Sequence, residues 1–246
     1  MSKVQTVLNS ENITIEKARE LVGNAALWPR VRDFLWEFAP QIHESWFDDV
    51  SLAPSPQSAQ SEDDGLNSSR TSHTLREINS PRVKRFILDT LGVEPCFHDF
   101  PKEDGSRLLL LDGATLLEVA KWLGALACAP ELRRVTDGAT VRALRASLPG
   151  VYPEVFGYTA YFGEFSSVCA APGDAEPQEA GERVLRTGHG ILVSALSRLP
   201  SPLVSRLAFK FPKDLRSSAP ACEMKHPTVL KLLKLKFPEA HSLCCC

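Results

Sequence analysis

Apolar residues recur at helical spacing along most of this chain. Residues 13–47 carry two such stripes, at Ile15, Ala18, Leu21 and Val22 and at Leu27, Val31, Phe34, Leu35 and Phe38. Apolar side chains three and four positions apart share one face of a helix. The spacing therefore predicts that residues 13–47 are helical. Pro29 falls in the first turn of the second helix, where its missing N–H costs little.

The best-defined helix is predicted to begin at Asp112, whose side chain can accept hydrogen bonds from first-turn amides. One apolar stripe follows it, at Leu116, Val119, Ala120, Leu123 and Ala127. Pro130 begins a short helix, and Asp137 is expected to cap another that runs to Leu148. Four arginines lie within thirteen residues here: Arg133, Arg134, Arg142 and Arg145. Such a run of helices with tight corners is typical of an irregular helical bundle.

Further helices are predicted at residues 82–91, 183–199, 203–211 and 227–237. Gly188 and Gly190 each weaken the predicted helix at 183–199 by about 1 kcal/mol relative to Ala. Glycine inside a helix usually permits the close approach of another helix. The short apolar run 107–111 is equally typical of a strand and of the start of a helix. The pattern therefore leaves room for a minor pair of short strands.

Residues 51–80 change character, because Ser, Pro, Gln, Asn and acidic residues dominate and apolar residues are rare. Such a segment cannot bury enough apolar surface to offset its ordering entropy, so a disordered polar loop is predicted. The expected organisation is an N-terminal helical part at 1–50, this loop at 51–80, and a main helical domain at 81–246 with a basic C-terminal helix. The fold class predicted is mainly α, an irregular multi-helix bundle with long polar loops.

Composition places the chain among globular proteins, with 43% hydrophobic and 24% charged residues in 246. The net charge of -2 indicates no bulk attraction to nucleic acid or anionic lipid. The charge is uneven, however: from Glu182 onward there are eleven Lys and Arg against four Asp and Glu, and the remainder has 17 against 26. This asymmetry suggests a face for an acidic partner, and an uneven but solvated surface is the alternative.

No apolar run approaches the ~20 residues of a transmembrane helix. The N-terminus lacks the apolar stretch of a secretory signal. The seven cysteines form no Cys-x-x-Cys pair. Reduced thiols in a cytosolic protein are the simplest account of them.

No nucleotide-binding glycine pattern, nucleophile elbow or metal-ligand spacing is present, so no cofactor and no metal site is expected. His98 and His189 would serve a hydrolase or transferase, but a structural role outweighs that reading. Cys244, Cys245 and Cys246, with the lysines of 227–237, suggest an alternative function as a lipid-anchored or membrane-associated peripheral protein. A frayed terminus with reduced thiols is the plainer interpretation. The basic tail lacks interleaved exposed aromatic residues, so nucleic acid is not an expected partner.

Three segments, in this order along the chain, together resemble one known family. The first is LLEVAKWLGALACAPELRRVTDGATVRALRASL, which contains Leu123-Gly124 and Leu132-Arg133-Arg134. The second is TGHGILVSALSRLPSPLVSRLAFKFP, with Arg206, Leu207, Lys210 and Pro212, and the third is HPTVLKLLKLKFPEAHSL. Their order and spacing resemble the type III secretion accessory proteins known as SctK or YscK.

The resemblance implies a cytoplasmic component of the injectisome sorting platform without enzymatic activity. Members of that family act as adaptors that link the cytoplasmic domain of the inner-membrane ring to the pod protein, which carries the stator and the ATPase. The resemblance also implies a location at the cytoplasmic face of the bacterial inner membrane and a requirement in protein secretion.

Four arginines are the candidate residues of a protein interface: Arg133, Arg134, Arg142 and Arg206. Helical arginines that lie off an apolar stripe can pair bidentately with the carboxylates of a partner. Intramolecular salt bridges within the same bundle are the alternative role for these side chains.

Overall fold

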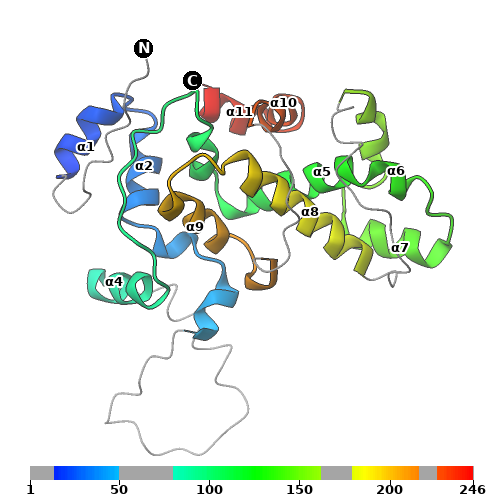
Figure 1. Ribbon diagram of the computed structural model, residues 1–246, viewed down its shortest axis with the longest axis horizontal. Coiled ribbons are helices and arrows are strands. Elements are labelled where there is room, and N and C mark those ends of the chain that lie inside the picture. The colour runs from blue at the N-terminus through cyan, green and yellow to red at the C-terminus, as the bar shows by residue number, and fades with distance from the viewer. Residues whose placement is uncertain (1–13, 50–79, 162–178, 216–225, 246) are drawn as a thin grey trace, which may run out of the picture. The chain divides into compact units, whose positions relative to one another are not determined.

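The computed structural model describes residues 14–49, 80–161, 179–215 and 226–245. These residues form ten α-helices, seen in Figure 1, together with several 3-10 turns and no strand. The mainly α fold expected from the apolar periodicity is therefore confirmed. Two compact units divide the chain: unit 1 comprises Met1–Phe100 and Ser201–Lys213, and unit 2 comprises Pro101–Pro200 and Asp214–Cys246. The disordered loop expected at 51–80 falls, but for its last residue, outside the described residues, and the three-part organisation stays a prediction.

Unit 1 is built around buried aromatic rings. Its α-helices in the described residues are α1 (Ile15–Val22), α2 (Trp28–Leu35), α4 (Pro81–Thr90) and α9 (Ser201–Phe209). The Phe34 ring is fully buried and makes edge-to-face contacts with Phe38 and Phe100, with ring centroids 5.5 and 5.8 Å apart. The second apolar stripe predicted from the sequence is thus the core of this unit. By contrast α1 buries Ala18 alone, and Ile15 of its stripe is 48% exposed.

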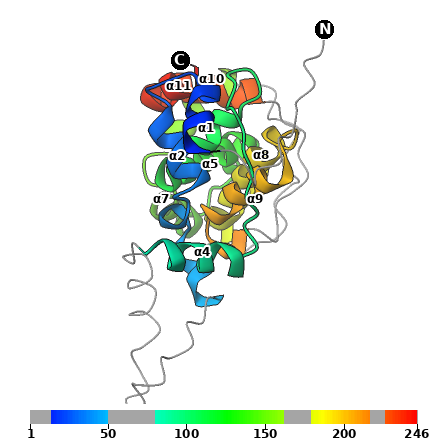
Figure 2. The same ribbon diagram turned by 90° about the vertical axis from the view of Figure 1, so that its left-hand side faces the viewer.

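The segment 201–213 reaches unit 1 from far along the sequence and completes it. The Phe209 carbonyl accepts a hydrogen bond from the His43 N–H at 2.8 Å. The Phe211 carbonyl accepts one from the indole N–H of Trp46 at 2.9 Å, in a buried position. The Trp46 and Phe209 rings also meet edge to face, with centroids 4.7 Å apart. The end of α9 is therefore fixed against the turns that follow α2, and both views show α9 beside α2 (Figures 1 and 2).

The helices of unit 2 in the described residues are α5 (Gly113–Ala127), α6 (Ala129–Leu132), α7 (Gly138–Ser147), α8 (Glu179–Ala195), α10 (His226–Lys236) and α11 (Pro238–Cys245). Helices α5 and α8 cross at very short range, as Figure 1 shows. A Cβ atom added at Gly188 would lie 1.7 Å from the Ala120 carbonyl oxygen, and one added at Gly124 would lie 1.8 Å from that of Val184. The close helix approach expected at Gly188 is confirmed, and Gly124 supplies its counterpart.

Aspartate caps begin two helices of unit 2, as the sequence predicted. The Asp112 carboxylate accepts from the Thr115 N–H at 2.8 Å, and the Asp137 carboxylate accepts from the Thr140 N–H at 2.7 Å. The hydrogen bonds from the Thr140 backbone and hydroxyl hold the pKa of Asp137 below its usual value. These caps satisfy first-turn amides that have no partner within the helix. They fix where α5 and α7 begin. The segment that connects these two helices contains Arg133 and Arg134.

Helix α10 is held in unit 2 by a lysine between two aromatic rings. The Lys236 ammonium lies 4.1 Å from the Trp122 ring centroid and 4.2 Å from that of Tyr158. It also donates to the Glu154 carboxylate at 2.8 Å. Cation–π contacts of this kind contribute roughly 0.5–2 kcal/mol each. Lys236, one of the lysines expected to give the tail a basic surface, is therefore engaged in contacts within unit 2.

The run 107–111, which the sequence left open between a strand and the start of a helix, is helical. Residues Ser106–Leu110 form a 3-10 helix that begins directly after Gly105, whose φ is 78°. No strand pair is formed by the described residues. The frayed terminus expected from the sequence is wrong for the residues up to Cys245, since Pro238–Cys245 forms α11 and the Cys244 side chain is 3% exposed. Proline at the first helical position supports this start, because its φ is already helical.

Candidate protein-binding site

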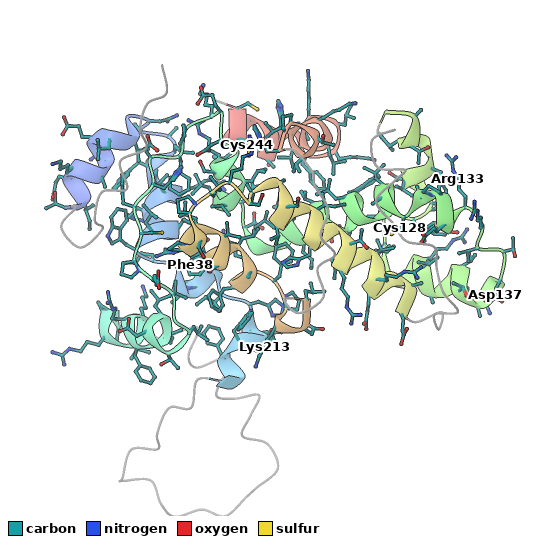
Figure 3. The ribbon with its side chains drawn as sticks, in the orientation of Figure 1. Phe38, Cys128, Arg133, Asp137, Lys213 and Cys244 are labelled. Carbon is teal, nitrogen blue, oxygen red and sulfur yellow. The ribbon has the colours of Figure 1, made fainter. Side chains whose placement is uncertain are left out.

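Three of the four candidate arginines lie on or beside α6 and α7 of unit 2. Arg133 follows the last residue of α6, and Figure 3 shows it together with Asp137, which precedes α7. The Arg133 guanidinium donates to the Thr159 hydroxyl at 2.7 Å and to the Phe156 carbonyl at 3.3 Å. Its carbon also lies 5.6 Å from the Phe156 ring centroid. Some of the N–H groups of Arg133 are therefore already hydrogen-bonded within unit 2.

Arg134 and Arg142 are exposed and have fewer internal contacts. Among the described residues neither forms an ion pair with a carboxylate. The buried Glu131 pairs with Arg183 at 3.6 Å, and Arg134 contributes only a longer-range attraction to it. The Arg142 guanidinium lies near the start of α7, close enough to Asp137 to lower the pKa of that carboxyl slightly. Both side chains thus keep their guanidinium groups available to a partner carboxylate.

Arg206 lies in unit 1 and is 2% exposed. Its guanidinium donates to the Phe34 carbonyl at 2.5 Å, to the Leu35 carbonyl at 3.1 Å and to the Glu94 carbonyl at 3.1 Å. Phe34 and Leu35 are the last two residues of α2, and carbonyls at a helix C-terminus lack partners within the helix. Arg206 therefore caps α2, with its positive charge at the negative end of the helix dipole.

A groove of about 510 Å³ in unit 1 includes Arg206 in its lining. Its walls come from the end of α2, from one face of α4 and from the segment that follows α4; they include Trp36, Leu88 and Cys96. A groove formed by these three residues was not predicted from the sequence. They lie in separate segments without a local motif, and only the packing of α4 beside α2 brings them together with Arg206.

The two histidines considered for catalysis are both buried. His98 is 7% exposed, and its Nδ1 accepts from the Phe100 N–H at 2.9 Å. His189 is 2% exposed within α8. Burial lowers the pKa of His189 to about 4. His189 is therefore neutral in the folded protein at neutral pH.

This burial makes the stability of unit 2 depend on pH. The ordinary histidine pKa is about 6.5, so the unfolded chain takes up a proton on His189 before the folded protein does. The free energy of unfolding should fall by up to about 3 kcal/mol as the pH is lowered from 6.5 towards 4. Urea unfolding of the wild type and of His189→Gln at pH 7.5, 6.0 and 5.0 measures this. The difference in the free energy of unfolding between the wild type and His189→Gln should become smaller as the pH is lowered. A difference that does not change with pH would contradict the conclusion that His189 is buried in its neutral form.

The described residues contain no cluster of three His, Cys, Asp or Glu side chains that could hold a metal ion.

Among the described residues there is no helix that is both long and apolar enough to cross a membrane. Val229, Leu232 and Leu233 of α10 are fully buried in unit 2, whereas Leu230 is half-buried and Leu235 is 44% exposed. The Cys244 thiol is buried and its pKa is raised to about 12, while Cys246 lies outside the described residues.

The described residues thus define a mainly α-helical protein, with exposed arginines on unit 2 and a groove lined by a buried arginine in unit 1. Residues 39–245 match the family model of YOP proteins translocation protein K (YscK), and the chain belongs to this family of type III secretion proteins. No curated protein and no solved structure matches the chain. The family match covers all three segments on which the resemblance rested.

Proposed function

We propose that this protein is a non-enzymatic cytoplasmic adaptor of the type III secretion sorting platform, at the cytoplasmic face of the bacterial inner membrane. It would link the cytoplasmic domain of the inner-membrane ring protein to the pod protein that carries the stator and the ATPase. The observation that carries the proposal is the family match over residues 39–245, which includes most of the described part of both units. The exposed arginines of unit 2 supply a surface on which such a contact can form.

Co-purification tests the adaptor function directly. The full chain is expressed with the ring protein's cytoplasmic domain, with the pod protein, and with both together. An adaptor should be retained by each partner separately and should bring the two into one complex. Deletion of its gene should abolish secretion of type III substrates into the medium. Unchanged secretion after deletion, or the absence of binding to both partners, would exclude this function.

The exposed arginines make a more specific prediction. Replacing Arg134 and Arg142 together by Glu should weaken the retention of one of the two partners by roughly tenfold or more, because like charges set opposite each other at an interface cost several kcal/mol. Thermal unfolding should change little, since both side chains are exposed. Arg82→Glu, at an exposed position of α4 in unit 1, is the control for charge reversal alone. Equal retention of the double variant and the wild type would exclude these residues from the interface.

A further inference from the structure

The groove in unit 1 combines an open hollow with a buried cation. Its volume of about 510 Å³ lies within the range of ~300–1,000 Å³ that is usual for ligand pockets. Its lining mixes apolar side chains, including Leu88 of α4 and Trp36 at the end of α2, with charged ones. Arg206, 2% exposed, belongs to this lining. The groove is thus large enough for a few side chains of another molecule.

The other charges in the lining neutralise one another. Lys84 forms an ion pair with Glu37, and Arg85 forms one with Asp89 at 3.0 Å. All four of these residues belong to the lining of the groove. Arg206 is the remaining charged residue there, and within the described residues it forms no ion pair with a carboxylate. The groove therefore carries one positive charge in excess.

The hydrogen bonds of Arg206 compensate this charge only in part. Its partners are three main-chain carbonyls, two of them at the C-terminus of α2, where the helix dipole amounts to about half a negative charge. Its Nε is buried and has no hydrogen-bond partner among the described residues. Burial lowers the pKa of Arg206, as expected for a cation removed from water without an anion beside it.

The nearby thiol does not supply the missing anion. Cys96 lines the same groove, and burial raises the pKa of its thiol above the ordinary value. Cys96 is therefore neutral at neutral pH. A buried charge is stabilised when an opposite charge is brought beside it in a site that excludes water. The two carboxylates of the lining, those of Glu37 and Asp89, are already paired with Lys84 and Arg85. Arg206 therefore has no carboxylate beside it, and the groove has room for one.

We propose that the groove binds an acidic segment of a partner polypeptide, with one carboxylate beside Arg206 and apolar side chains against Leu88 and Trp36. The choice of a polypeptide rests on the proposed adaptor function, while the negative charge follows from the groove itself. Aromatic side chains and arginine are the residue types that contribute most to binding at protein interfaces. Arg206 thus has two roles, as the cap of α2 and as the charge that selects the ligand.

A purified binding assay tests the proposal without the secretion apparatus. The probe is a fluorescent, terminally blocked peptide of alternating Glu and Leu, and its isosteric control has Gln in place of Glu. The change in anisotropy on addition of the full-length protein gives the dissociation constant of each peptide. The acidic peptide should bind roughly tenfold or more tightly than the neutral one. Equal binding of the two peptides would overturn the proposal.

A matched pair of substitutions at the half-buried Leu88 separates charge from damage to the fold. Leu88→Glu should weaken binding of the acidic peptide by roughly tenfold, whereas Leu88→Lys should preserve or strengthen it. Structural damage would weaken binding in both variants, and that result would count against the proposal. Arg82→Ala, on the same helix but outside the groove lining, should leave the dissociation constant unchanged. Circular dichroism and thermal unfolding establish that each variant is folded.

Two other occupants are distinguishable in the same assay. Inorganic phosphate that displaces the acidic peptide at a similar concentration would indicate a site for small anions, against the proposal. A second variant carries Glu62→Gln, Asp63→Asn and Asp64→Asn. If it binds the peptide much more tightly than the wild type, the chain's own acidic residues compete for the groove, and this result would also contradict the proposal. Peptide binding without co-purification of the ring or pod protein would support the groove and contradict the adaptor function. If the ring and pod proteins co-purify with the Leu88→Glu variant as well as with the wild type, and the acidic peptide does not bind, the adaptor function is supported and the proposal for the groove is contradicted.

Discussion

Replacing Gly124 or Gly188 by Ala should destabilise unit 2 strongly, although the same change at an ordinary helical glycine stabilises by about 1 kcal/mol. The added methyl group would lie 1.8 Å from the Val184 carbonyl oxygen in one case and 1.7 Å from that of Ala120 in the other. Both obstacles are main-chain atoms of the facing helix, so α5 and α8 would have to separate. We expect a loss of about 3 kcal/mol or more for each variant.

Thermal unfolding followed by circular dichroism measures this effect. A loss of about 3 kcal/mol corresponds to a melting temperature lower by roughly 10 °C for a unit of this size. The matched control is Gly157→Ala, because no heavy atom lies within 4 Å of a methyl group added there. A melting temperature of Gly124→Ala or Gly188→Ala at or above that of the wild type would show that the two helices do not cross at this distance.

The second large effect is expected at Arg206. Replacement by Met, which keeps the aliphatic part of the side chain, removes three hydrogen bonds to main-chain carbonyls, and the end of α2 loses its cap. We expect a loss of about 4 kcal/mol, since hydrogen bonds to charged groups contribute roughly 1.5–3 kcal/mol each and the carbonyls would stay buried. Arg206→Lys should recover less than half of this, because an ammonium cannot reproduce the planar fork of donors.

Chemical denaturation of the two variants and of Arg198→Met provides the test. Arg198 is exposed, so its replacement should leave the free energy of unfolding within about 0.5 kcal/mol of the wild type. A comparably small effect of Arg206→Met would mean that the guanidinium is not held by the α2 carbonyls. Recovery of full stability by Lys would mean that charge alone, without the fork geometry, is sufficient.

The sequence was informative wherever the determinants are local. The caps at Asp112 and Asp137 were predicted correctly, because a carboxylate and the amides that it accepts from lie within three residues of each other. The apolar stripe of α5 was likewise predicted, since helical periodicity is a property of one segment. The family was also correctly identified, on the order of three segments.

What the sequence did not reveal depends on contacts between distant segments. Arg206 was singled out as an interface candidate, yet its burial against Phe34 is visible only once α9 packs on α2. The groove beside it could not be predicted for the same reason. Helix α11 was not predicted: the last helix expected from the sequence covers 227–237, whereas in the structure Pro238 begins a further one. The interface roles of Arg133, Arg134 and Arg142 stay predictions.

The late position of α9 in the sequence has a consequence for synthesis on the ribosome. The bond between Arg206 and the Phe34 carbonyl joins residues 172 positions apart, and the whole first part of unit 2 is translated between them. At a translation rate of about 5–20 residues per second, Phe34 and Phe38 would wait roughly 10–30 s for the helix that covers them. Apolar surface exposed for so long is prone to aggregation, so production of this protein should depend on chaperones or on slow expression at low temperature.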